Sequence, residues 1–144
     1  MVDAGLCALL SGNSVLTALL ASADGQPAIF AGDAPDDLAM YPCVSYAFVG
    51  GSADPTMQTS GMIRQRIEIN GFATLPSGSL SAGSVAAAIR SAVIAAVNGW
   101  QQLLSDGTNV SNAELLNPGT DFVSEDRIFR CMCEFYVYYT LPTS

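Results

Sequence analysis

The sequence predicts an α+β fold, with a mainly antiparallel β-sheet and a long Ala-rich helix and short N-terminal helices packed on one face. Two segments of equal length and β-rich composition carry this prediction, GMIRQRIEINGFAT at 61–74 and RIFRCMCEFYVYYT at 127–140. The third observation is segment 80–98, in which apolar residues recur every four positions, as on one side of a helix. We therefore expect the two β-rich segments to be long neighbouring strands of one sheet.

The segment 61–74 alternates in side-chain character, which is typical of a strand with two different faces. Its apolar face consists of Ile63, Gln65, Ile67 and Ile69, and its polar face consists of Arg64, Arg66, Glu68 and Asn70. We expect the apolar face to lie under the helix stripe, which is formed by Val85, Ile89, Val93 and Val97. In segment 127–140 the aromatic residues point to both faces, so at least two rings lie on the side away from the helix.

The other elements follow in chain order. A first helix is expected at 3–10 and a second short one after it, capped by Ser14 and with Val15, Leu16, Leu19 and Leu20 as its apolar side. Strands are expected at 28–31 and 43–49, followed by an irregular segment 50–61 that forms the tip of an antiparallel hairpin. Gly99 is placed to end the long helix. Segment 100–104 is compatible with either strand or helix, and 110–116 is expected to be a strand.

Composition indicates one domain with a surface for association. A chain of 144 residues fits a single domain over 1–144. Hydrophobic residues make up 50 % and charged residues only 12 %, about half the usual share. We expect part of the apolar surface to contact another subunit.

Charge and residue types argue against several function classes. The chain has five arginines, no lysine, no histidine and 13 acidic residues, for a net charge of −8. Five cations supply little of the basic face that a duplex-DNA binder carries. Without histidine the commonest general base and metal ligand is missing. No catalytic constellation or phosphate-binding loop is found, so we expect no enzyme and no cofactor.

Two acidic groups leave alternatives open. Asp33, Asp36 and Asp37 could hold a hard cation, but in a proline-containing loop they are more often solvated, so no metal is expected. Glu68 and Glu134 could face each other as a carboxylate pair. Arg64, Arg66 and Arg130 on the same strands favour an ion-pair ladder instead.

The cysteines and apolar segments give no sign of export. Cys7, Cys43, Cys131 and Cys133 lack C-x-x-C spacing, and buried free thiols in a reducing cytoplasm are expected. Segment 1–21 is apolar but has Asp3 and no basic residue before its apolar run, so we expect neither a signal peptide nor a membrane span.

The order of these features resembles a known family, the tail-completion or tail terminator proteins of long-tailed bacteriophages, which also occur in prophages and gene-transfer particles. The resemblance is carried by LCALLSGNSVLTALLA, AIF followed by AP and YPCVSY, GMIRQRIEINGFA, SAGSVAAAIRSAVIAAVNG and RIFRCMCEFYVYY. It implies a non-enzymatic virion protein that forms a homo-oligomeric ring, typically a hexamer, at the head-proximal end of the tail. Such a ring caps the tail-tube protein, ends its polymerisation and joins the head connector or stopper protein. It is assembled in the cytoplasm of the host bacterium.

The resemblance also suggests which residues contact partners. We expect the hairpin tip to engage a neighbouring ring, through Asp54, Pro55, Thr56, Met57 and Gln58. The sheet edge and the Ala-rich helix are expected to form subunit contacts. The face away from the helix is either solvated or covered by another subunit, and its aromatic rings favour the subunit contact; its candidate residues are Arg64, Arg66, Glu68, Arg130, Tyr136 and Tyr138. DNA would pass through the channel without specific binding, since the summed acidic charge repels it. The alternatives are another head-tail neck adaptor, such as a head completion protein, and a dimeric α+β domain that binds a small molecule.

Overall fold

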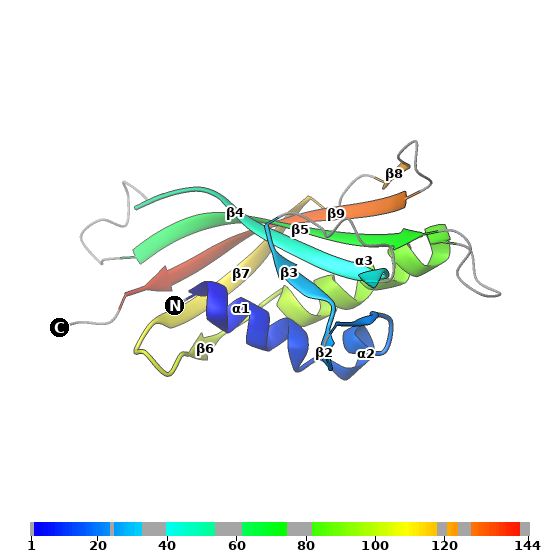
Figure 1. The fold of residues 1–144 in the computed structure, drawn as a ribbon. Helices are drawn as coiled ribbons and strands as arrows, with labels where there is room; N and C mark the ends of the chain where they lie inside the picture. Colours follow the sequence, from blue (N-terminus) through cyan, green and yellow to red (C-terminus); the bar gives the residue numbers. More distant parts are fainter. Residues whose placement is uncertain are drawn as a thin grey trace.

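In a computed structural model, helices lie on one side of a large β-sheet (Figure 1). The structure describes residues 2–23, 25–32, 40–53, 62–74, 82–117, 121–123 and 128–141. Within these ranges, seven strands form one sheet in the order β3-β4-β5-β9-β7-β6, with β8 paired to β9. Their bounds are β3 Ile29–Ala31, β4 Cys43–Ala53, β5 Met62–Thr74, β6 Gln102–Leu103, β7 Asn109–Asn117, β8 Asp121–Val123 and β9 Ile128–Thr140. Only the β3–β4 pair is parallel among these described strands, so the predicted α+β class with a mainly antiparallel sheet is confirmed.

The centre of the sheet is the pair of long strands that the sequence predicts. β5 and β9 run antiparallel along their whole length, from Met62 opposite Thr140 to Thr74 opposite Ile128. In β9 the side chains alternate between buried and half-buried, with Phe135 and Val137 fully buried. We call the side of the sheet that packs on α3 the inner face and the opposite side the outer face.

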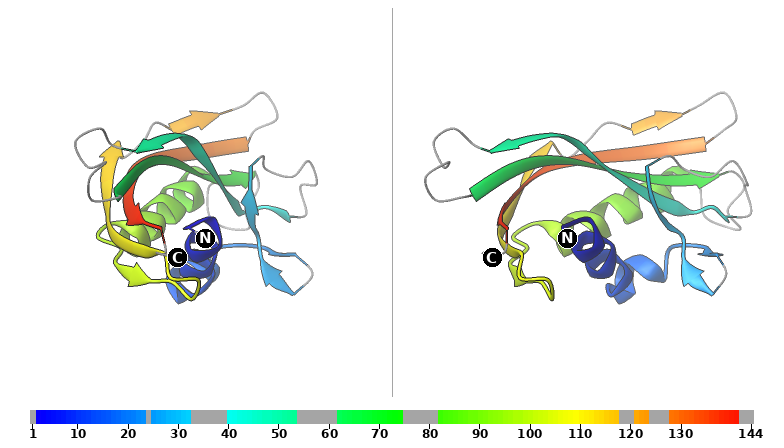
Figure 2. Two further views of the ribbon diagram at one scale, coloured as in Figure 1. Left: turned by 90° about the vertical axis from the view of Figure 1, so that its left-hand side faces the viewer. Right: turned by 60° about the vertical axis from the view of Figure 1, so that its left-hand side comes forward.

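The helices lie on the inner face (Figures 1 and 2). α1 spans Val2–Ser11, α2 spans Ser14–Thr17 and α3 spans Ala82–Val97. α3 crosses β5 and β9, and its apolar stripe is buried, with Val85, Ile89, Val93 and Val97 each less than 9 % exposed. Burial of this stripe against the inner-face Ile67 and Ile69 builds the core, which α1 extends with Val2, Leu6 and Leu10.

The second helix differs from the prediction at its cap and its apolar side. Asn13, and not Ser14, is the N-cap: its Oδ1 accepts a hydrogen bond from the Leu16 N–H at 2.9 Å. The helix ends after one turn, with Leu16 fully buried and Val15 66 % exposed. Leu19 and Leu20 lie beyond the end of the helix and pack against the core. Asn13 has the extended backbone that an N-cap needs, whereas Ser14 is already helical.

Strand boundaries also differ around the hairpins. Segment 22–27 forms a small hairpin, with β1 at Ser22–Ala23 and β2 at Gln26–Pro27. The β4–β5 hairpin is antiparallel as predicted, but β4 runs to Ala53, past a register shift between Val49 and Gly51. The expectation of irregular chain at 50–53 is therefore wrong, because a β-bulge takes up one residue and the ladder continues. The tip residues 54–61, with the candidates Asp54 to Gln58, lie outside the described residues, as do Asp33, Asp36 and Asp37.

Segment 100–104, for which the sequence allowed either strand or helix, contains the short strand β6. β6 pairs with the start of β7, and Gly107 makes the turn between them with φ +94°. Gly99, which follows α3, has φ +80°, in agreement with its predicted place at the helix end. All four cysteines are free, and Cys43, Cys131 and Cys133 are buried. No helix in the described part of the chain has the length and hydropathy to span a membrane.

Candidate functional site

The outer face of the sheet brings together most of the residues that the sequence singles out. Directly opposite one another across β5 and β9 are Arg64 and Tyr138, Arg66 and Tyr136, Glu68 and Glu134, and Phe72 and Arg130. The described helices all lie on the other side of the sheet (Figure 2). These side chains therefore form one continuous polar and aromatic surface, which is the candidate functional site.

The predicted ion-pair ladder is present only in part. Arg66 Nη2 lies 3.1 Å from Glu134 Oε2, with the arginine side chain 44 % exposed and the glutamate 14 % exposed. Glu68 lies directly opposite Glu134, but its Oε1 accepts a hydrogen bond from Asn70 Nδ2 at 3.1 Å. Arg66 therefore offsets the repulsion that two facing carboxylates would otherwise produce.

Arg64 contacts an aromatic ring, and this is where the ladder prediction is wrong. Its guanidinium lies 4.6 Å from the centre of the Tyr136 ring, in the range of a cation–π interaction. Tyr136 packs edge-on against Tyr138, with ring centres 6.3 Å apart. The Tyr138 hydroxyl donates to Glu114 Oε2 at 3.2 Å, and burial together with this hydrogen bond raises the pKa of Tyr138. The four side chains form a chain of contacts across β5, β9 and β7.

The middle of the outer face contains a buried acceptor. Asn70 is 9 % exposed, and its Oδ1 has no hydrogen-bond partner among the described residues. Ser45, opposite Asn70 on β4, is also buried. A buried acceptor without a donor costs free energy, so the Asn70 amide oxygen is a local weak point of the sheet as described.

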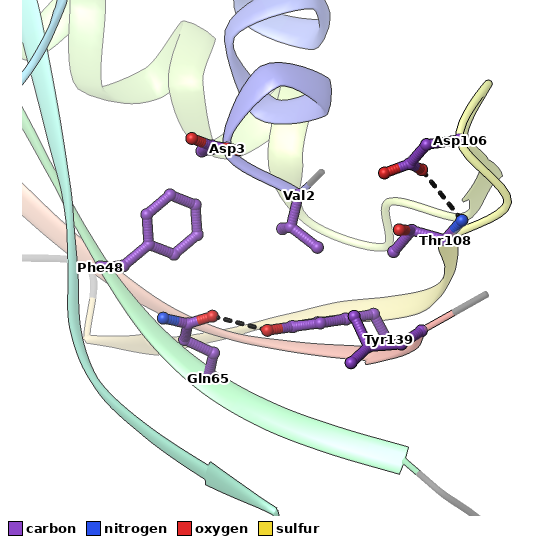
Figure 3. Close-up of a pocket in the computed structure, with 8 residues that line it drawn as sticks. Val2, Asp3, Phe48, Gln65, Asp106, Thr108 and Tyr139 are labelled. Carbon is purple, nitrogen blue, oxygen red and sulfur yellow. Dashed lines mark hydrogen bonds between the residues drawn. The ribbon is translucent and has the colours of Figure 1, made fainter. Parts of the chain in front are cut away.

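A cavity of about 550 Å³ lies at the other side of the sheet, next to the start of α1 (Figure 3). Its lining comes from α1, three strands and two loops, with Val2, Asp3, Phe48, Gln65, Asp106, Thr108, Tyr139 and Leu141. Gln65 Oε1 accepts from the Tyr139 hydroxyl at 2.8 Å, and Asp106 Oδ1 accepts from the Thr108 N–H at 3.0 Å. The cavity wall is thus mainly apolar. It also carries the carboxylates of two exposed residues, Asp3 and Asp106.

The buried thiols are poor nucleophiles. Burial raises the pKa of Cys43 and of Cys133 to about 12, so both are protonated at neutral pH. Cys133 Sγ lies 3.6 Å from the Ile69 carbonyl oxygen, in hydrogen-bonding range for sulfur. In the part of the chain that the structure describes, no three His, Cys, Asp or Glu side chains are grouped to hold a metal ion. The arrangement of the described side chains on both faces is suited to binding.

The predicted site residues on β5 and β9 all lie on the outer face, and Arg130 lies at its far end, opposite Phe72. One participant was missed. Glu114 is found only once the register of β7 against β9 is known, whereas Asn70 was placed on this face by alternation and only its burial is new. The cavity has no signature in the sequence, because its lining residues come from distant segments that only the fold brings together.

Comparison with known proteins places the chain in a family. No curated protein matches the chain, whereas a family model does. Residues 4–140 match the family described as "Tail completion protein gp17", which covers nearly the whole sequence and confirms the resemblance to phage tail-completion proteins. The match identifies a structural protein of a bacteriophage tail, and the sheet that carries the outer face lies wholly within the matched residues. The chain therefore belongs to the gp17 family of tail completion proteins.

Proposed function

We propose that this protein forms a homo-oligomeric ring, typically a hexamer, that caps the tail tube, ends its polymerisation and joins the tail to the head connector. The observation that carries the proposal is the outer face, a polar and aromatic surface that the described helices leave uncovered. The role is structural, with no catalysis.

The composition of the outer face supports a protein partner. Tyrosine and arginine are the residues that dominate the binding energy of protein interfaces. Here Arg64, Tyr136 and Tyr138 are already held in place by contacts with one another, so little side-chain freedom is lost on binding.

A ring requires two different contact surfaces on each subunit, because its contacts are heterologous. The outer face supplies one. The exposed apolar side chains Leu103, Leu116 and Leu141 supply candidates for another, since large apolar groups are exposed there at 71 %, 41 % and 58 %. The high apolar content of the chain agrees with such a second contact.

Net charge supports passage of DNA through the ring. Each subunit carries a formal charge of −8, and the charge adds over the subunits of a ring. An acidic channel repels the phosphate backbone, so DNA would pass without binding. This charge supports the proposed position at the head-proximal end of the virion tail, on the path of the genome.

The test compares assembly of the unmodified protein with that of the double variant Arg64→Glu/Arg66→Glu. Native mass spectrometry and negative-stain microscopy, in the presence of tail tubes, should show hollow rings or capped tubes only for the unmodified protein. The control is Ser91→Glu/Gln101→Glu, which adds acidic charge at exposed positions outside the outer face and should assemble normally. Normal assembly by the arginine variant would show that the outer face is merely solvated.

The cavity favours one other function, a dimeric domain that binds a small molecule. Its volume is within the range of ligand pockets. A compact dimer at all concentrations, with no ring on tail tubes, would support this alternative. A ring that binds the head side of an assembled neck but not the tube would instead indicate another neck adaptor, such as a head completion protein.

A further inference from the structure

Strand β4 is paired on both sides in its first part and on one side in its second part. β3 lies against residues 44–46 of β4. The Gly32 N–H donates to the Tyr46 carbonyl at 2.8 Å, and Gly32 has φ +89°, a left-handed conformation that turns the chain at the end of β3. Along residues 47–53, no strand among those described pairs with β4 on the side away from β5.

The backbone at Phe48 points toward this open side. The Val44 N–H donates to the Ala28 carbonyl at 2.9 Å, and the Tyr46 carbonyl accepts from Gly32, so both residues direct backbone groups away from β5. Backbone direction alternates with a period of two along a strand. The N–H and C=O of Phe48 therefore point to the same side, beyond the end of β3.

The open edge lacks the usual protection. Toward the opposite edge of the sheet, by contrast, backbone groups of β7 have partners. The Ala113 carbonyl accepts a hydrogen bond from the Gly99 N–H at 2.8 Å, and the Leu115 N–H donates to Asn98 Oδ1 at 3.4 Å. Exposed edges are commonly blocked by charged residues or proline. Segment 47–53, AFVGGSA, has neither, and its bulge begins only after Val49. Among the described residues, the regular part of the edge without a pairing strand is therefore centred on Phe48.

The cavity adjoins this edge. The Phe48 ring forms part of its wall, and Asp3 and Gln65 lie on either side of the ring (Figure 3). A strand added beside Phe48 would direct every second side chain toward the inner face, where the cavity lies. Asp3 contributes an exposed carboxylate to this region, and no arginine is among the described residues that line it.

We infer that the open edge of β4 and the cavity together bind an extended segment of a different protein, by strand addition at Phe48. In this mode main-chain hydrogen bonds supply affinity and pockets for alternate side chains supply specificity. One inward side chain is apolar and enters the cavity, and the inward side chain two residues away is basic and pairs with Asp3. A second copy of this chain fits poorly, because it carries a net charge of −8 and has no lysine. The inference goes beyond ring formation, which uses the outer face.

The test begins with selection of capped peptides, about nine residues long, by mRNA display against the immobilised protein. Threonine occupies every second position and the others are random. The expected consensus places Arg or Lys two positions from Leu, Ile, Val or Phe. No enrichment, or an acidic consensus, would overturn the inference.

Affinity of the selected peptide, measured by fluorescence anisotropy, then tests each part of the site. Phe48→Ala removes the ring, and Phe48→Pro removes both the ring and the edge-facing N–H while leaving the β5 ladder intact. Phe48→Pro should bind about tenfold more weakly than Phe48→Ala. Asp3→Asn should weaken binding several-fold and reduce its salt dependence. Glu114→Gln, an acidic residue on the outer face, is the matched control and should bind normally.

A variant of the peptide keeps the test decisive if Phe48→Pro fails to fold. N-methylation of alternate peptide amides should abolish binding in one register and leave it unchanged in the other, as only one set of amides pairs with β4. Equal binding by both N-methylated peptides would rule out strand addition. Ring formation is measured separately with the Arg64→Glu/Arg66→Glu variant, so loss of peptide binding leaves that result unaffected.

Discussion

Gly71 is where the sheet and the long helix approach most closely among the described glycines. A Cβ built on Gly71 would lie 2.6 Å from Ile89 Cγ2 and 3.2 Å from Ile89 Cβ. Isoleucine is branched at Cβ and cannot swing this methyl group away without leaving its preferred rotamer. The absence of a side chain at position 71 thus allows α3 to pack directly on β5.

We predict that Gly71→Ala lowers the free energy of unfolding by about 1–3 kcal/mol, the usual cost of overpacking a core. Urea denaturation measures the effect. Ile89→Ala alone should cost about 2–5 kcal/mol, as for a buried isoleucine. The double variant should cost less than the sum of the two, because removal of Cγ2 makes room for the new methyl group. Additive costs would show that the close approach is unimportant.

The buried thiols give a prediction in the alkaline range. Burial raises the pKa of Cys43 and Cys133 to about 12 in the folded protein, above the value that thiols have in an unfolded chain. The folded state therefore holds these protons more tightly, and this contribution to stability is complete below about pH 8.5 and is lost as pH rises towards 12. Between pH 7 and pH 10, the free energy of unfolding measured by urea denaturation should fall less for Cys43→Ala than for the unmodified protein.

Thiol labelling checks the same burial at neutral pH. Iodoacetamide, followed by peptide mass spectrometry, should modify the half-buried Cys7 first and Cys43 and Cys133 only on unfolding. Rapid labelling of Cys43 in the folded protein would contradict its burial.

At the scale of elements, the pairing of β5 with β9 organises the molecule. Alternation within each strand predicts which residues share a face, and the structure confirms this for the isoleucines of β5 and the cysteines of β9. Alternation does not specify register. That Glu68 faces Glu134, and that Arg64 reaches Tyr136, follow only from how the two strands are aligned.

We predict that Arg66→Met destabilises the protein by about 0.5–1 kcal/mol in low salt, the range of exposed ion pairs. Part of the cost comes from leaving Glu134 and Glu68 to repel each other, so Arg66→Met/Glu68→Gln should recover most of the stability. Urea denaturation at low salt and in 1 M NaCl provides the measurement, and the difference should shrink in high salt. A double variant no more stable than Arg66→Met would exclude the repulsion.

At the scale of the whole molecule, the β4–β5 hairpin offers a way to separate folding from assembly. The ladder extends to Ala53 opposite Ile63, so the tip begins after Ala53. Deleting residues 54–59 leaves Ser60, Gly61 and Met62 to connect the strands, and three-residue hairpin loops are common.

We predict that this deletion leaves the melting temperature nearly unchanged but yields tails of uncontrolled length or tails that do not join heads. Electron microscopy of particles, made with the variant as the sole source of the protein, measures both outcomes. Replacing 54–59 by glycine and serine at the same length separates the loss of side chains from the loss of reach. Normal tails from the deletion would refute a recognition role for the tip.

The sequence by itself determined the class of fold, the two long strands, the helix stripe and the family, because each depends on local periodicity or on the order of features along the chain. Only the tertiary structure decided the N-cap at Asn13, the extension of β4 to Ala53, the place of Glu114 on the outer face and the cavity beside Phe48. These depend on strand register, on a bulge and on the meeting of distant segments. Such contacts arise from the packing of the whole chain, and no local pattern encodes them.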